Sequence, residues 1–170
     1  MSKKPAIVMI LLLSATLAFA QEAAQDPNVL KSFTRSGKFK GVTLFFVHMN
    51  NKTVEALFQA PTKYSMRARA NMATMLYVQG TPDEDGTLNT EFTLEQKGQT
   101  TNGTPVNVKN FKAGPVVKGE RIDGIIQFET KVDLSQPFTV KNADAEVEFK
   151  LESDALKLLE PPKPEGEAKK

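Results

Sequence analysis

The sequence predicts an all-β protein: a single antiparallel β-sandwich, immunoglobulin-like or jelly-roll-like, with a small β-barrel as the alternative. Apolar and polar residues alternate over several segments of strand length, and Gly, Pro and Asn separate these segments at short intervals. The spacing accommodates roughly seven strands and no long helix. The chain has 170 residues, 40% of them hydrophobic and none of them Cys, so it is expected to bury one modest core without disulfides.

The first half of the chain is interpreted as two hairpins. A strand is expected over residues 39–49, where apolar residues on both faces indicate a central position, and a turn at 50–52 would lead into a partner strand over 54–60. Residues 64–78 carry conflicting signals. Their Ala, Met and Arg content favours a helix, while apolar and polar residues alternate in strand fashion. We take the alternation as decisive and expect a strand that pairs with 88–96 across the loop 80–86.

The second half contains the most regular alternation. Residues 97–120 are irregular, with a short strand expected at 106–111, and a long strand is expected from Arg121 to Leu134. A last strand begins at Phe138. Its apolar parity changes after Asn142, so a bulge or a break is expected near that residue.

The flanking segments predict export. Residues 1–20 combine a basic start, an apolar run and Ala18-Phe19-Ala20, which is the pattern of a cleaved signal peptide and is too short to span a bilayer. We expect a periplasmic or secreted protein, and the short Lys-led signal and the absence of Cys favour a bacterial source. The expected organisation is a signal peptide over 1–20, a flexible lead-in over 21–32, a β domain over 33–153, and a short helical turn with a disordered Lys/Glu/Pro-rich tail over 154–170.

Charge argues against a nucleic-acid partner. The formal net charge of +2 comes from Lys3 and Lys4, and the remaining residues carry as many acidic as basic side chains. A neutral chain lacks the long-range attraction that nucleic-acid binders use. No second apolar run is long enough to cross a membrane, so no transmembrane segment is expected in the mature chain.

Catalysis is not expected, and no cofactor is expected. His48 is the only histidine, there is no Cys, and no G-x-S-x-G segment supplies a nucleophile. Most carboxylates lie on the polar faces of the expected strands, where solvation keeps their pKa values ordinary. Weak metal candidates are Asp83 and Asp85 for calcium and His48, Met49, Met72 and Met75 for copper, although a turn and a packed core explain these residues more simply.

Two further groups are candidates for ligand binding. Lys63, Arg67 and Arg69 would form a patch for an anionic ligand, unless Glu91 and Glu95 neutralise the arginines across the expected hairpin. A set of aromatic residues would line a cavity for an apolar ligand if the strands enclose one, and would otherwise form the core. This set is Phe45, Phe46, Phe58, Phe92, Phe128 and Phe149.

The sequence therefore favours an exported, non-catalytic binding or interaction module. Its partner would be another protein or an envelope component, contacted through sheet edges or the loops at 81–86 and 97–120. One alternative is a carrier of an apolar or lipid-like ligand, and another is a metal-binding or glycan-active protein. The identity of the ligand and the oligomeric state stay open on the sequence.

Overall fold

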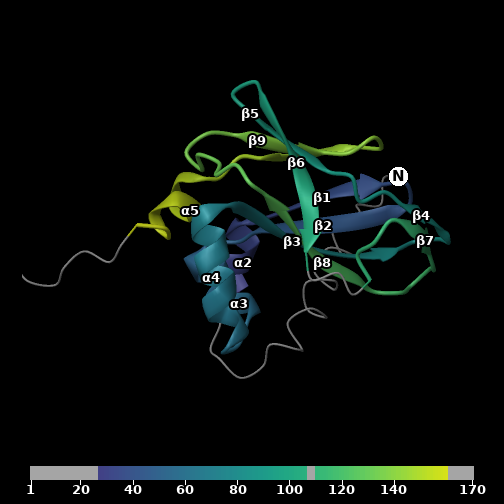
Figure 1. Cartoon of the computed structure of the whole chain (residues 1–170), viewed down its shortest axis with the longest axis horizontal. Coiled ribbons are helices and arrows are strands. Elements are labelled where there is room, and N and C mark those ends of the chain that lie inside the picture. Colours follow the sequence, from purple (N-terminus) through teal and green to yellow (C-terminus); the bar gives the residue numbers. More distant parts are fainter. Residues whose placement is uncertain (1–26, 107–109, 161–170) are drawn as a thin grey trace, which may run out of the picture.

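The computed structural model describes residues 27–106 and 110–160, and it is mostly β (Figure 1). Within the described residues, one short helix precedes the main sheet, two further helices interrupt it, and one helix follows it. The elements in chain order are α2 (Pro27–Ser32), β1 (Thr34–Phe39), β2 (Val42–His48), α3 (Asn51–Leu57), α4 (Thr62–Met72), β3 (Thr74–Pro82), β4 (Gly86–Leu88), β5 (Thr93–Gln96), β6 (Gln99–Val106), β7 (Gly114–Val116), β8 (Ile122–Phe128), β9 (Phe138–Lys141), β10 (Glu146–Phe149) and α5 (Ser153–Lys157).

Eight strands form one antiparallel sheet in the order β1-β2-β3-β8-β6-β5-β9-β10, and β4 pairs with β7 in a small second sheet. The large sheet curves until its two edge strands meet. Arg35 of β1 donates a hydrogen bond to the carbonyl of Lys150, just after β10, and a Cβ on Gly37 of β1 would lie 2.5 Å from Val147 of β10. The expected all-β class is confirmed, and the sheet is nearly a closed barrel.

The buried apolar residues form two clusters, one on each side of the sheet. The larger cluster fills the barrel interior with aromatic rings and aliphatic side chains from β1, β2, β3, β8, β9 and β10. The smaller cluster lies under the helices, where Val54 of α3 and Met66 and Ala70 of α4 cover Met75 of β3 and Ile125 of β8. This cover explains why the ends of β2 and β3 nearest the helices are buried on both faces.

Two tight turns join neighbouring strands. Lys40 and Gly41 connect β1 to β2, and Lys97 and Gly98 connect β5 to β6. All four have positive φ angles, between 39° and 80°. Two consecutive residues of positive φ are what a type I′ hairpin turn requires, and its twist matches the twist of the strands.

Two expected strands of the first half are helices. Residues 54–60 do not pair with 39–49, since α3 occupies Asn51–Leu57 and the strands that pair with β2 are β1 and β3. Residues 64–78 are helical as far as Met72 and become β3 only at Thr74. On α4 the buried residues are Met66 and Ala70, one helical turn apart, so propensity was the correct signal and the alternation was misleading.

The pairing expected for the middle of the chain was also wrong. β3 pairs with β2 and β8 rather than with residues 88–96, because those residues divide between β4 and β5. The expected strand at 106–111 is displaced, since β6 covers Gln99–Val106, residues 107–109 lie outside the described part, and Phe111 is buried without being in a strand. The expected break near Asn142 is confirmed as the turn between β9 and β10, closed by the Asn142 side chain accepting from Asp144 N at 2.8 Å.

The N-terminus of α3 is held by a capping box. The Asn50 side chain accepts hydrogen bonds from the backbone N–H groups of Lys52 and Thr53 at 2.9 and 3.1 Å, and Thr53 Oγ1 accepts from Asn50 N at 2.8 Å. Asn50 is buried, so these N–H groups have no easy access to water.

We expect Asn50→Ala to destabilise the protein by about 1–2 kcal/mol, because it leaves the donors at the start of α3 without partners. Chemical denaturation of the purified variant measures this loss. Asn51→Ala is the matched control, since Asn51 is the exposed first residue of the helix. Equal effects at the two positions would contradict a specific role for the cap.

The expected signal peptide, the first six residues of the lead-in and the tail beyond residue 160 lie outside the described residues. The last six residues of the lead-in form α2, and the expected helical turn after the domain is α5. Within the described residues, no helix is long and apolar enough to cross a membrane.

Candidate binding surface on helix α4

The sequence-predicted site residues are distributed over both faces of the sheet and over the helices. His48 ends β2 and is 0% exposed, with its ring 6.2 Å from the Phe138 ring. Neither ring nitrogen has a hydrogen-bond partner in the described structure. Burial lowers the pKa of His48 to about 3, and nearby Lys131 adds to this effect. The ring is therefore neutral at pH 7, and within the described part of the chain it is hydrogen-bonded to no hydroxyl that it could activate as a base.

The four copper candidates do not converge. Met72 is 73% exposed on α4, whereas Met49 and Met75 are buried together under the helices. His48 lies on the opposite face of the sheet, against the barrel interior. Met66, which the sequence did not single out, joins Met49 and Met75 in the smaller cluster, where the methionines fill the space between helices and sheet.

The calcium candidates are each engaged separately. Asp83 forms an exposed ion pair with Lys38 at 3.6 Å, and Asp85 accepts a hydrogen bond from the backbone N–H of Lys118 at 2.8 Å. Among the described residues, no group of three or more His, Asp and Glu side chains is placed to hold a metal ion. The acidic residues 83–85 therefore form a connecting loop between β3 and the small β4–β7 sheet, as an ordinary turn would.

The aromatic candidates divide among three environments. Phe46, Phe92, Phe128 and Phe149 lie in the barrel interior, Phe58 packs edge-on to Tyr77 beneath the helices, and Phe45 is half-buried on the outer face. The interior rings touch one another: Phe39, Phe46 and Phe92 form a triangle of edge-to-face contacts with centroids 5.5 to 5.7 Å apart. Such contacts are typical of a packed core.

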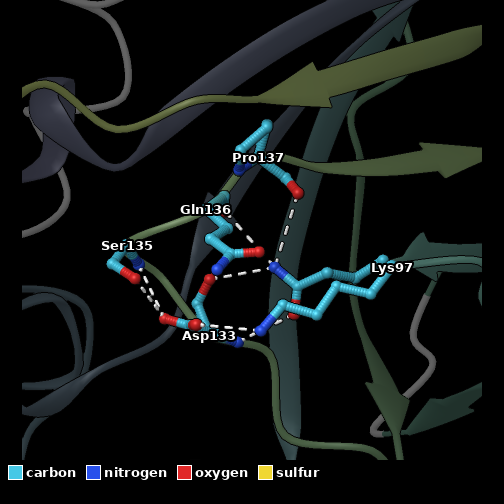
Figure 2. A network of polar contacts seen from close by, with 6 residues as sticks. Lys97, Asp133, Ser135, Gln136 and Pro137 are labelled. Atoms are coloured by element: carbon cyan, nitrogen blue, oxygen red, sulfur yellow. Dashed lines mark hydrogen bonds and ion pairs between the residues drawn. The ribbon is translucent and has the colours of Figure 1, made fainter.

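A polar network braces the loop that precedes β9 (Figure 2). The Gln96 amide donates to the carbonyl of Asp133 at 2.9 Å and accepts from its N–H at 2.9 Å. The Asp133 carboxylate accepts from Ser135 Oγ at 2.6 Å and pairs with Lys97 at 3.3 Å. Hydrogen bonds from Ser135, followed by that from Lys97, lower the pKa of Asp133. Asp133 is therefore a weak proton acceptor, and the network positions the loop rather than a nucleophile.

The three basic candidates all lie on α4, but their side chains turn to different neighbours. Lys63 and Arg67 both form ion pairs with Glu55 of α3, Lys63 at 3.0 Å, and Arg69 donates to Gln127 of β8 at 2.9 Å. The expected neutralisation by Glu91 and Glu95 was wrong, since Glu95 pairs with Lys141 at 2.6 Å. This segment is a helix and not part of a hairpin, so its basic side chains have other neighbours than those expected for a strand.

The outer face of α4 also presents apolar side chains, which the sequence reasoning missed. Tyr64 is 60% and Met72 is 73% exposed, and Ala68 between them is exposed as well. These residues recur every four positions, so on a helix they form one stripe. The spacing was visible in the sequence, but it indicates a stripe only once the segment is known to be helical. We call Tyr64, Ala68 and Met72 the α4 stripe.

Lys131 anchors the C-terminal end of this helix and was not singled out either. Its ammonium group donates to the carbonyl of Ala70 and, at 3.5 Å, to that of Ala73. A cation at this end satisfies carbonyls that lack helical partners and complements the helix dipole. Burial lowers the pKa of Lys131. The α4 stripe therefore lies on a helix that is held in place by its packing against the sheet and by Lys131 at its C-terminal end.

Comparison with known proteins gives no relative: no family model matches the chain, and no similar curated protein or solved structure is found. Function is accordingly inferred from the arrangement of this chain's own residues.

Proposed function

We propose that this protein is an exported, non-catalytic binding module and that the outer face of α4 is its contact surface. The observation that carries the proposal is the exposure of Tyr64 and Met72. Among the described residues, only three large apolar side chains are exposed, and two of them lie on this one helix face. Scattered apolar residues are ordinary on a protein surface, but neighbours aligned along one helix are typical of a contact site.

The surroundings of the stripe support a binding role. Lys63 Nζ lies 5.5 Å from the centre of the Tyr64 ring, so a cation and an aromatic face are presented together. Tyrosine supplies a large contact area with few rotatable bonds, and it is enriched in binding surfaces. Met72 supplies a flexible apolar side chain that adapts to the shape of a partner.

Two findings favour this function over the alternatives. The single histidine is buried without a hydrogen-bond partner, and among the described residues no three or more His, Asp and Glu side chains are grouped to hold a metal ion, which supports a non-catalytic role. The contacts between the interior aromatic rings support a packed core in place of a carrier's ligand cavity.

Site-specific photocrosslinking in cells that express the full chain tests the proposal. We expect a photoreactive phenylalanine analogue at Tyr64 to form adducts, because that side chain would face the partner. The same analogue at Thr100 is the control, since Thr100 is exposed on β6, in the region that the sequence first suggested. Adducts at 100 and none at 64 would overturn the assignment to α4. The recovered protein begins at Gln21 if export removes residues 1–20.

A further inference from the structure

The helical layer carries a local excess of positive charge. Residues 51–72 contain four basic residues and one acidic residue, whereas the described chain as a whole contains equal numbers of each. The basic residues are Lys52, Lys63, Arg67 and Arg69, and the acidic residue is Glu55. Charge is therefore segregated: α3 and α4 are basic, and the rest of the described barrel is acidic.

The positive charge and the apolar side chains occupy the same side of the molecule. α3 and α4 contact each other and lie together outside the barrel, away from the small β4–β7 sheet (Figure 1). Glu55 is shared by Lys63 and Arg67, so it neutralises only part of their charge. Arg69 is bound to the neutral amide of Gln127 and keeps its full charge. The α4 stripe is thus bordered by uncompensated cationic groups.

We propose that the partner of this surface is an anionic phospholipid membrane, on which α4 lies parallel to the bilayer plane. Tyr64 and Met72 enter the headgroup region, and the basic side chains of α3 and α4 bind the lipid phosphates. This inference rests on the proposed function, because it names the partner of the same surface.

A membrane fits the shape of the surface better than a protein does. A specific protein interface buries about 800 Å² on each partner around a central apolar cluster. The α4 stripe is a single line of three side chains, which offers less apolar contact area than such a cluster. A bilayer interface instead accepts individual apolar side chains from a helix with basic neighbours, and its binding strength adds apolar burial to electrostatic attraction. Tyrosine is also one of the residues that favour the headgroup level.

The structure also indicates the depth of the contact. α4 has 11 residues, and its Met66 and Ala70 are already buried against the sheet. The opposite face alone is free to meet lipid, so the helix stays at the interface and remains part of the folded domain. Binding should consequently be weak, reversible and dependent on ionic strength.

Vesicle flotation tests this inference with the purified mature chain. We expect the protein to float with vesicles that contain phosphatidylglycerol and not with vesicles of phosphatidylcholine alone, and we expect high salt to release it. Tyr64→Ser with Met72→Ser should lower the partition coefficient by about tenfold or more, because apolar insertion is lost. Lys52→Gln with Lys63→Gln should weaken binding and flatten its salt dependence.

Matched controls come from the far side of the molecule. Val117→Ser removes the third exposed apolar side chain, which is 57% exposed beside β7, and Lys112→Gln with Lys118→Gln removes two positive charges from the same region. Neither control should change flotation. Binding that is equal for all variants, or absent with anionic vesicles, would overturn the membrane inference. A protein adduct at position 64 without vesicle binding would retain the proposed contact surface and reject the membrane as its partner.

Discussion

Gly124→Val should unfold the barrel or destabilise it by about 3 kcal/mol or more, because the site has no room for a side chain. Gly124 is buried in the middle of β8, opposite Val78 of β3. A Cβ at this position would overlap Phe111 Cβ and lie 2.9 Å from Phe111 Cγ. Phe111 cannot rotate away from a contact with its own Cβ, and its ring is stacked on Phe92. The clash must therefore move the backbone or expel the ring from the core.

Thermal and denaturant unfolding of the purified variant measure this loss. Gly86→Val is the matched control, because a Cβ on Gly86 meets only the Lys40 carbonyl at 3.9 Å. We expect the control to change stability by no more than about 0.5 kcal/mol, as is usual for exposed positions. Similar losses for the two variants would show that Phe111 is not packed against β8.

Acid should destabilise the protein through His48, and His48→Leu should remove much of this sensitivity. Burial lowers the pKa of His48 to about 3 in the folded state, whereas the unfolded chain titrates near 6.5. As the pH falls below about 6.5, His48 binds a proton in the unfolded state but not in the folded state, so the free energy of unfolding falls. The slope is about 1.4 kcal/mol per pH unit, which amounts to about 4–5 kcal/mol by pH 3.

Urea denaturation of the wild type and of His48→Leu between pH 7 and pH 4 isolates this contribution. The difference in stability between the two proteins should grow as the pH falls, because other titrating groups are common to both. At pH 7 the variant should be about as stable as the wild type or more so, since it removes two ring nitrogens that lack partners. A difference that stays constant with pH would mean that His48 is solvated or hydrogen-bonded in the folded protein.

The errors in the sequence interpretation have a common physical cause. At residues 64–72, alternation and helix propensity predicted different structures, and only the sheet that the helix covers decides which residues are buried. Met66 and Ala70 face that sheet, while Tyr64 and Met72 remain exposed. Local signals for two other features were present but were not used: the Asn50–Thr53 capping box, and the Lys-Gly pairs at both hairpin turns.

The candidate binding surface was predicted only in part. The basic residues Lys63, Arg67 and Arg69 were identified from their charge, and the structure places them on one helix. Glu55, the ion-pair partner of Lys63 and Arg67, was missed, because the pairing depends on α3 packing beside α4. Lys131 was missed for the same reason: it reaches the end of α4 from 58 or more residues away in the chain.

The sequence by itself determined the all-β class, an apolar core free of disulfides, and the break at Asn142, because strand periodicity and composition are properties of the local chain. The tertiary structure decided three features that the periodicity of the sequence does not encode. It fixed the strand order that brings β1 against β10, the cover of the sheet by α3 and α4, and the exposure of the α4 stripe. Each of these depends on which distant segments pack together, and burial, not local pattern, sets which side chains are left for a partner.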